Sequence, residues 1–356
     1  MTKRLPDDSF WKNKKVLVTG HSGFKGSWLV IWLNKLGAKV SGISLTPETK
    51  PNLFTEANIE KICHSQFIDI RNLEKVKAQI LSIQPQIIIH MAAQPLVRES
   101  YKSPISTFET NVIGTANILE SIQYCSSVEA AILITTDKVY KNNEDGKPYS
   151  EDDQLGGHDP YSASKAAAEI VIESYKKSFF DERNISISSA RAGNVIGGGD
   201  WSKDRLIPDL IRSWQTNSTL NVRNPDSVRP WQHVLEPLAG YLFLAEDTFQ
   251  NLELCGPYNF GPCKKDIGSV KDVVTIADSH LGLLDIDFLD ENNGPHEANL
   301  LFLDTYKSNS ILNFEPSWDM KESVLKTTNW YKSYYEDNSA LSLCELDIIE
   351  FEASLA

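Results

Sequence analysis

Apolar and polar positions follow two alternating patterns over roughly the first half of the chain. Short and mostly apolar runs, which are typical of buried strands, are followed by longer segments whose apolar positions have helical spacing. The predicted strands cover residues 15–19, 39–45, 66–70, 86–90, 130–136 and 185–190, and the predicted helices cover 27–37, 73–83, 105–124 and 161–180. Strands that alternate with helices favour an α/β fold with a doubly wound parallel sheet.

The alternation ends near residue 194, where a glycine-rich loop and a predicted helix at 205–214 begin a different region. We interpret this region as a smaller C-terminal lobe that binds the substrate. Helices such as 237–246 are expected to return to the sheet. The expected division is a first domain at 11–195, joined again by 232–262, and a lobe made of 196–231 and 263–356.

Three glycines follow the first predicted strand at positions 20, 23 and 26, directly before the first predicted helix. Gly20 permits a tight turn, Gly23 allows close approach of a pyrophosphate, and Gly26 allows the helix to pack against the strand. The first amides of the helix are then available to phosphate oxygens. This arrangement predicts a Rossmann-type dinucleotide site.

Two features of this loop suggest weak cofactor binding. His21 and Lys25 occupy positions where small or apolar residues would ease the approach of a dinucleotide. The strand at 39–45 is followed by Thr46 and Pro47, without the acidic residue that usually binds the adenosine ribose. We therefore expect NAD to be held weakly, and the choice between NAD and NADP stays open.

Tyr161 and Lys165 are four residues apart in a predicted helix, so they share one helix face. A free tyrosine, with a pKa near ~10, is a poor base at neutral pH. A neighbouring ammonium and a positive nicotinamide would both lower that pKa. Thr136, at the end of a predicted strand, is expected to bond the same substrate hydroxyl. Together these residues predict proton and hydride transfer at a carbinol.

Composition limits the partners and the location. The net charge is −13, with an acidic excess at 336–352, which disfavours nucleic acid and anionic membranes. No apolar stretch reaches the ~18 residues of a membrane span, and no secretory signal is visible. The five cysteines are scattered without a C-x-x-C pair, so we expect neither disulfides nor a metal site. A reducing cytoplasm is the simplest location.

The chain resembles the extended short-chain dehydrogenases/reductases along nearly its whole length. Thr136-Asp137-Lys138 stands where the sugar-nucleotide 4,6-dehydratases of that superfamily carry Thr-Asp-Glu, and epimerases lack this charged pair. The substitution of lysine for glutamate is similar to the CDP-glucose 4,6-dehydratases. Two further segments carry the same resemblance: Gly20-His21-Ser22-Gly23-Phe24-Lys25-Gly26-Ser27-Trp28 and His90-Met91-Ala92-Ala93-Gln94-Pro95-Leu96-Val97-Arg98.

The resemblance implies a redox-neutral loss of water from CDP-glucose. Tyr161 would take the proton of the sugar 4-hydroxyl while a hydride passes from C4 to NAD. Asp137 would protonate the departing 6-hydroxyl, and Lys138 would act at C5, either as a base or as a stabiliser of the enolate. The hydride would then return to C6. Supply of deoxysugars for bacterial lipopolysaccharide O-antigen is the usual setting of the family.

The resemblance also assigns the ligand contacts. The expected cofactor residues are Gly20, His21, Gly23, Phe24, Lys25, Gly26, Asp69, Ile70, Ala92, Ala93, Asn111, Tyr161 and Lys165, and the expected substrate residues are Gln94, Arg98, Asn194, Arg205, Leu206, Arg223 and Arg229. For Asp69, a plain role in a loop is as reasonable as contact with the adenine. His296 and Glu297 stand where related enzymes often have an arginine, which leaves the choice of pyrimidine open.

The helices at 105–124 and 161–180 commonly form a four-helix dimer interface in this family, so a homodimer is expected by analogy. Three other functions remain to be distinguished. A 4-epimerase would use the same tyrosine without a group acting at C5, a non-catalytic member would only bind NAD, and an NADP-dependent ketone reductase would consume reduced cofactor.

Overall fold

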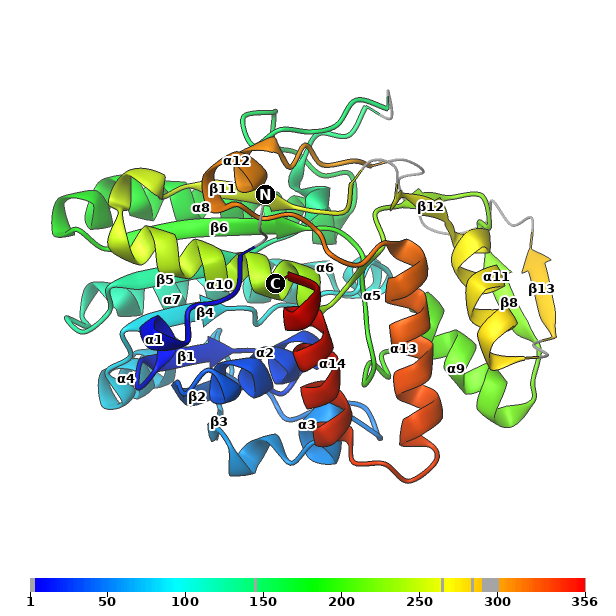
Figure 1. Ribbon diagram of the computed structural model, residues 1–356. Helices are drawn as coiled ribbons and strands as arrows, with labels where there is room; N and C mark the ends of the chain where they lie inside the picture. Colours follow the sequence, from blue (N-terminus) through cyan, green and yellow to red (C-terminus); the bar gives the residue numbers. More distant parts are fainter. Residues whose placement is uncertain (1–3, 144–145, 264–265, 283–284, 290–300, 356) are drawn as a thin grey trace.

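A parallel sheet of seven strands forms the centre of the molecule in the computed structural model, which describes residues 4–143, 146–263, 266–282, 285–289 and 301–355 (Figure 1). The strands are, in spatial order, β11 (Pro257–Phe260), β6 (Ser186–Ala192), β5 (Ala130–Ile134), β4 (Ile87–His90), β1 (Lys15–Thr19), β2 (Lys39–Ser44) and β3 (His64–Phe67). Every neighbouring pair is parallel. The predicted α/β fold with a doubly wound sheet is confirmed.

Successive residues of β1 face opposite sides of the sheet, and each side has its own apolar core. Leu17 packs in a cluster with α4 (Leu73–Ile83), α7 (Gly114–Gln123) and α8 (Pro160–Tyr175). Val16 and Val18 belong to the larger cluster on the other face. The helices of that face are α2 (Phe24–Lys35), α10 (Leu235–Gln250) and α14 (Ala340–Leu355), which lie in front of the sheet in Figure 1.

A second group of elements lies to one side of the sheet, at the right of Figure 1. It contains α9 (Leu206–Thr216), α11 (Val270–Leu281), and the parallel pair β8 (Leu220–Arg223) and β13 (Ile286–Leu289), and α13 (Met320–Tyr334) packs against α11. Short pairs connect it to the sheet: β7 (Val195–Ile196) with β10 (Gln232–His233), and β9 (Val228–Arg229) with β12 (Gly268–Ser269). The C-terminal α14 contacts α2, and α12 (Tyr306–Leu312) contacts β11 and α10, so these later helices lie beside the sheet.

The predicted bounds of the third strand were wrong, and two predicted helices contain π-helical turns that were not predicted. The third strand ends at Phe67, so Asp69 lies in the turn beyond it and not at a strand end. The predicted helix 105–124 is divided into α6 (Pro104–Phe108), a π-helical turn (Glu109–Ile113) and α7. The predicted helix 161–180 continues from α8 into a π-helical turn (Lys176–Phe180). The strand β11 was not predicted.

The remaining elements are short. They are α1 (Asp8–Trp11), α3 (Leu53–Glu56), α5 (Val97–Lys102) and the 3-10 turns Ile59–Lys61, Asp137–Val139, Asp181–Arg183 and Leu252–Leu254. Among the described residues, no helix is both long and apolar enough to cross a membrane.

Candidate active site

The carboxyl ends of the central strands meet at one edge of the sheet, as parallel strands require. Thr19, the last residue of β1, is in register with His90, the last residue of β4. The glycine loop follows β1, and Thr136 follows β5. Helix α8 reaches this edge because Lys165 Nζ donates a hydrogen bond to the carbonyl oxygen of Ile134 at 3.0 Å. Residues from distant parts of the sequence therefore share one site.

The glycine loop has the geometry that the spacing predicts. Gly20 has φ of +76°, which few other residues adopt. A Cβ on Gly26 would lie 2.1 Å from the carbonyl oxygen of Gly20, so only glycine allows α2 to approach the loop. A Cβ on Gly23 would be 3.4 Å from the nearest atom, again the Gly20 oxygen. The protein itself therefore leaves room at Gly23, which is exposed.

The N-terminus of α2 fits a dinucleotide diphosphate. Gly23 is the N-cap residue and no side chain caps the helix, so the first amides of α2, including those of Phe24 and Lys25, face the loop. The tip of β2 carries no carboxylate for a ribose. Its last residue, Ser44, donates a hydrogen bond to Ser22 Oγ at 2.8 Å.

His21 is turned away from the mouth of the loop. Its ring is fully buried against β2, where a Cβ on Gly42 would lie 2.2 Å from His21 Cγ. Phe54 and Phe67 flank the ring at centroid distances of 5.6 and 6.4 Å. Burial lowers the pKa of His21 to about 4, so the ring is neutral at pH 7. The expected obstruction of the dinucleotide by this side chain is therefore not what the geometry shows.

Lys25 points from the first turn of α2 into the site. Its Nζ donates a hydrogen bond to the hydroxyl of Tyr241, from α10, at 2.7 Å. Burial, together with the positive charges of Lys165 and Arg205, lowers the pKa of Lys25 to about 7, while the charge of Asp137 opposes this shift. This lysine therefore shares one electrostatic environment with Lys165, Arg205 and Asp137.

Tyr161 lies at the start of α8 and is nearly buried. Burial raises its pKa to about 12, although a hydrogen bond with Thr136 and the charge of Arg205 act in the opposite direction. The expected depression of this pKa by Lys165 was wrong for the protein alone, because desolvation of the phenolate is the larger effect. Arg205 is the cation that acts on the phenol.

Lys165 is also buried, and burial lowers its pKa to about 8. The charge of Glu169, one turn further along α8, opposes this effect. At pH 7 the side chain therefore remains mostly an ammonium. Its hydrogen bond to Ile134 fixes it beneath the end of β5.

Thr136 and Asp137 open the 3-10 turn that follows β5. Thr136 Oγ1 donates a hydrogen bond to Asp137 Oδ1 at 2.8 Å, and both residues are buried. Lys138 Nζ lies 3.9 Å from the same carboxylate oxygen, and its side chain is 24% exposed. A carboxylate and an ammonium are thus held side by side, and the charge of Asp137 acts on Tyr161.

His90 connects three elements behind this edge. Its Nδ1 is 2.7 Å from Thr19 Oγ1 and its Nε2 is 3.1 Å from Thr115 Oγ1. The Thr115 hydroxyl donates to the carbonyl oxygen of Asn111, so it accepts a hydrogen bond from Nε2. Burial lowers the pKa of His90 to about 3, so one neutral tautomer is fixed. Thr19 Oγ1 also accepts from the amides of Met91 and Ala92, which holds the turn leading to Ala93.

Asn111 and Gln94 bond to protein groups. Asn111 accepts from the amide of Gln94 at 2.8 Å and donates to Ser164 Oγ at 2.9 Å. The side chain of Gln94 donates to Leu96 and Thr107. Asn111 lies in the π-helical turn, a feature that often marks functional sites. These residues shape the loop and α8, whereas direct ligand contact remains a prediction.

Asp69 has the plain loop role that the sequence left open. Its carboxylate bonds Arg71 through Nε at 3.0 Å and through Nη2 at 2.6 Å. These hydrogen bonds lower the pKa of Asp69. Ile70 is buried against Gly114, where a Cβ would lie 2.5 Å from its Cδ1. Contact of either residue with an adenine remains a prediction.

The residues expected at the nucleotide end lie on several elements. Arg205 is the N-cap residue of α9 and bonds Asp200 at 3.1 Å, and Leu206 begins the helix. Arg223 ends β8, 3.9 Å from Asp204, and Arg229 lies in β9. Asn194 follows β6, and Arg98 lies in α5. His296 and Glu297 are outside the described residues.

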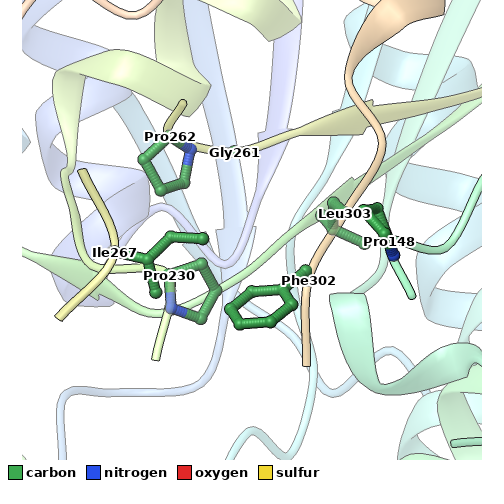
Figure 2. Close-up of a pocket in the computed structure, with 7 residues that line it drawn as sticks. All are labelled: Pro148, Pro230, Gly261, Pro262, Ile267, Phe302 and Leu303. Carbon is green, nitrogen blue, oxygen red and sulfur yellow. The ribbon is translucent and has the colours of Figure 1, made fainter. Parts of the chain in front are cut away.

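A small cavity of about 20 Å³ lies beside Pro230 (Figure 2). Its lining residues are Pro148, Pro230, Gly261, Pro262, Ile267, Phe302 and Leu303. A Cβ on Gly193 would lie 2.6 Å from Pro230 Cγ and 3.1 Å from Asp137 Oδ2, so the cavity borders the turn that carries Asp137. Since none of its lining residues is ionisable, it is a neighbour of the catalytic groups and not their location.

Sequence analysis missed the buried ion pair of Glu169 and Arg191 and the hydroxyl of Tyr241. Glu169 follows Lys165 by four residues, and Arg191 interrupts a strand of small and apolar residues. A charged residue at positions 169 and 191, where the pattern predicts burial, could have indicated a buried ion pair. No group of His, Cys, Asp and Glu that could hold a metal occurs in the described ranges.

Comparison with known proteins supports the predicted resemblance. A family model described as GDP-mannose 4,6 dehydratase matches residues 17–327. A CDP-glucose 4,6-dehydratase from Salmonella typhimurium is 43% identical over 354 residues, covering 97% of this chain and 98% of the relative.

Two solved structures share the fold. A dTDP-glucose 4,6-dehydratase from Bacillus anthracis in complex with NAD has a TM-score of 0.75 at 23% identity and covers 92% of this chain and 99% of its own. A UDP-glucose 4-epimerase from Thermotoga maritima with UDP-glucose has a TM-score of 0.76 at 19% identity and covers 90% and 99%. The extent of the family match, with the site described above, shows that the chain belongs to the GDP-mannose 4,6 dehydratase family.

Proposed function

We propose that this protein is a CDP-glucose 4,6-dehydratase, which converts CDP-glucose to CDP-4-dehydro-6-deoxyglucose and water. The observation that carries the proposal is the adjacent pair of Asp137 and Lys138 beside Tyr161 and Lys165. Oxidation at C4 requires only the second pair, whereas removal of the 6-hydroxyl requires groups that act at C5 and C6. The full-length similarity to a CDP-glucose enzyme supports this choice of substrate.

NAD fits the glycine loop in this proposal. Gly20, Gly23 and Gly26 would admit the diphosphate to the amides at the start of α2, and Lys165 would bind the nicotinamide ribose. The chemistry supplied by a bound NAD is that of a hydride acceptor for C4 and, afterwards, a hydride donor for C6. The absence of a carboxylate at the tip of β2 supports weak binding, and calorimetry that found nanomolar retention would contradict this.

Tyr161 acts as the base for the 4-hydroxyl, with Thr136 bonded to the same oxygen. Its pKa of about 12 in the protein alone is too high for this role, so a cation must be added or brought closer in the complex. Arg205 and Lys165 are the protein's candidates, and a nicotinamide cation would act in the same direction. Tyr161 accepts the proton of the 4-hydroxyl, and the hydrogen on C4 is transferred as the hydride.

Asp137 donates a proton to the departing 6-hydroxyl, so that water is the leaving group. Lys138 acts at C5, where the 4-ketone has made the hydrogen acidic. It either removes that hydrogen as a base, or it stabilises the enolate by its charge while the Asp137 carboxylate takes the C5 proton and passes it to the departing 6-hydroxyl. The Thr136 hydroxyl, which donates to Asp137, orients this carboxylate after oxidation at C4 and before removal of the 6-hydroxyl.

The nucleotide end of the substrate lies towards α9, β8 and β9 in this proposal. The guanidinium groups of Arg205, Arg223 and Arg229 have the planar geometry that suits diphosphate and ribose oxygens. Asn194 and the first amides of α9, beginning at Leu206, would bind the diphosphate as well. Gln94 and Arg98 would border the sugar.

We also propose a homodimer through the outer faces of α6, α7 and α8. Several large apolar side chains on α6, on α8 and in the π-helical turns next to α7 and α8 are exposed: Ile105, Phe108, Ile113, Ile170 and Phe179. A shared surface of this kind is typical of a protein interface. The assembly would work in the cytoplasm, where the five free cysteines would stay reduced, and would supply deoxysugar for O-antigen.

A panel of glucose nucleotides tests this function. CDP-glucose, dTDP-glucose and UDP-glucose are incubated separately with the protein and NAD, and the 4-keto product is measured by its ultraviolet absorption in base. We expect CDP-glucose to give by far the highest kcat/KM, without accumulation of reduced cofactor. Conversion to a 4-epimer without a keto product would instead identify an epimerase.

A further inference from the structure

Glu169 and Arg191 form a buried ion pair beneath the catalytic residues. Their side chains are 4% and 3% exposed. Arg191 Nε lies 3.0 Å from Glu169 Oε1, and Nη2 lies 2.9 Å from Oε2, so the pair is bidentate. Two hydroxyls also donate hydrogen bonds to the carboxylate of Glu169: Thr135 to Oε1 at 2.5 Å and Ser189 to Oε2 at 2.8 Å.

The carboxylate of Glu169 holds two catalytic segments in register. Thr135 directly precedes Thr136, so its hydrogen bond fixes the end of β5 relative to α8. Lys165 lies one helical turn before Glu169 on the same face of α8. Its Nζ bonds Ile134, the residue before Thr135. One glutamate therefore fixes α8 to the segment that carries Thr136 and Asp137.

The guanidinium of Arg191 fixes the other side of that segment. Its Nη1 donates to Tyr140 Oη at 2.8 Å and to the carbonyl oxygen of Glu151 at 3.1 Å. Tyr140 follows the turn Asp137–Val139, and its hydroxyl donates to Asn259 of β11 at 2.7 Å. The turn is thus held at both ends by the same ion pair.

We propose that Glu169 and Arg191 are a positioning pair for the reaction, which hold Lys165 charged and in place and set the turn of Thr136 and Asp137 against Tyr161. The inference rests on the proposed function, because it assigns Lys165 a role in proton transfer. Neither residue of the pair is expected to touch substrate or cofactor.

The charges around Lys165 support this role. Lys25 faces it from α2, the neutral His90 faces it from β4, and Tyr161 and Glu169 lie on its own helix. Burial and the cation of Lys25 favour the neutral amine, whereas Glu169 favours the ammonium. Burial alone would raise the pKa of Glu169, but the charge and hydrogen bonds of Arg191, with Thr135 and Ser189, hold that pKa below its usual value. The carboxylate therefore stays ionised across the working pH range.

The test compares Glu169→Gln with Ser189→Ala, which removes one hydrogen bond from the same carboxylate without changing its charge. Lys165 is titrated by NMR with carbon-13 at the lysine ε position and is assigned with Lys165→Met. In Glu169→Gln we expect the pKa of Lys165 to fall by about one unit or more. The alkaline limb of kcat should move to lower pH by the same amount. For a shift of one unit this lowers kcat about fivefold at the pH of the wild-type midpoint, while KM changes less than about twofold. Ser189→Ala should keep the wild-type titration.

An unchanged Lys165 titration in Glu169→Gln would overturn the proposal. Glu169→Gln leaves Arg191 charged and buried, so this variant is at risk of failing to fold. The double variant Glu169→Met with Arg191→Met leaves no isolated charge and carries the same test, with the same expected fall in pKa. Failure of the proposed function would look different: wild-type protein would not dehydrate CDP-glucose, whereas the NMR titrations would still separate the variants.

Discussion

At the scale of single residues, burial controls the chemistry of the site. It raises the pKa of Tyr161 to about 12 and lowers those of Lys165 and Lys25 to about 8 and 7. All three shifts favour the neutral form. Tyr161 therefore stays protonated at neutral pH and cannot act as a base until a cation lowers its pKa. Tyr161 and Lys165 were recognised from their spacing together with the preceding glycine loop, whereas the direction of the pKa shift of the tyrosine required knowledge of its burial.

Lys138 is tested by changing its charge and its basicity separately. Lys138→Met should retain oxidation at C4 and lose C5 hydrogen exchange by about 10²-fold or more. Lys138→Arg keeps the charge but cannot act as a base. Recovery of exchange in the arginine variant would assign electrostatic stabilisation, and no recovery would assign the base. Loss of C4 oxidation in Lys138→Met would contradict both roles.

Lys25 makes folding stability depend on pH. Its pKa is about 7 in the folded protein and near 10.5 when unfolded, so between these values the unfolded state binds more protons. The free energy of unfolding should therefore rise with pH across this window. Lys25→Met lacks this rise and should be the more stable protein at pH 7, by at least about 1 kcal/mol. Denaturant titrations of both proteins, without cofactor, at pH 7 and pH 10 measure the free energies of unfolding. The same change in this free energy between the two pH values in both proteins would contradict the burial of this ammonium.

At the scale of elements, two glycines of the loop can be tested separately, Gly26 for the packing of α2 and Gly23 for the binding of NAD. Gly26→Ala places a methyl group 2.1 Å from a carbonyl oxygen and should destabilise the fold by about 1–3 kcal/mol or more. Gly23→Ala meets only a contact at 3.4 Å and has an ordinary φ of −79°. It should change stability by less than about 1 kcal/mol while weakening NAD binding at least about tenfold.

Thermal melts and calorimetric NAD titrations of the two glycine variants distinguish these effects. Normal NAD affinity in a folded Gly23→Ala protein would show that the diphosphate does not approach this position.

Five of the six strands before residue 195 were predictable because each is a largely continuous run of apolar or small residues. The exception is β3 (His64–Phe67), which is polar and not buried, so its predicted bounds were wrong. Strand β11 was missed because Pro257 and Asn259 interrupt that pattern, although Asn259 is buried by its hydrogen bonds to Tyr149 and Asp304. The π-helical turn Glu109–Ile113 within the predicted helix 105–124 was not visible either, and Asn111 of that turn bonds Gln94 and Ser164. Long-range polar contacts of this kind leave no periodic signal.

At the scale of the whole molecule, the edge of the sheet and the outer helices carry different kinds of side chain. Residues from β1, β4, β5 and α8 converge at the edge, whereas α6, α8 and the two π-helical turns expose apolar side chains elsewhere. Sequence spacing identified the first set. The second set depends on which helix faces the fold leaves uncovered, so only the family resemblance suggested it.

The proposed dimer is tested by introducing charged residues into its interface. Ile113→Glu and Ile170→Glu place carboxylates at positions that are 52% and 61% exposed, and each should shift the protein to monomer in sedimentation velocity at micromolar concentration. Tyr306→Glu, at a position on α12 that is 76% exposed, is the matched control and should leave the dimer intact. A wild-type monomer would contradict the interface.

Internal hydride transfer coupled to loss of water is the central claim, and turnover of CDP-glucose in deuterium oxide tests it most directly. The product is analysed by NMR and mass spectrometry. The account predicts CDP-4-dehydro-6-deoxyglucose with one solvent deuterium at C5, the former C4 hydrogen at C6, and no net reduced cofactor. A product without deuterium at C5, or with its C6 hydrogen drawn from solvent, would contradict it.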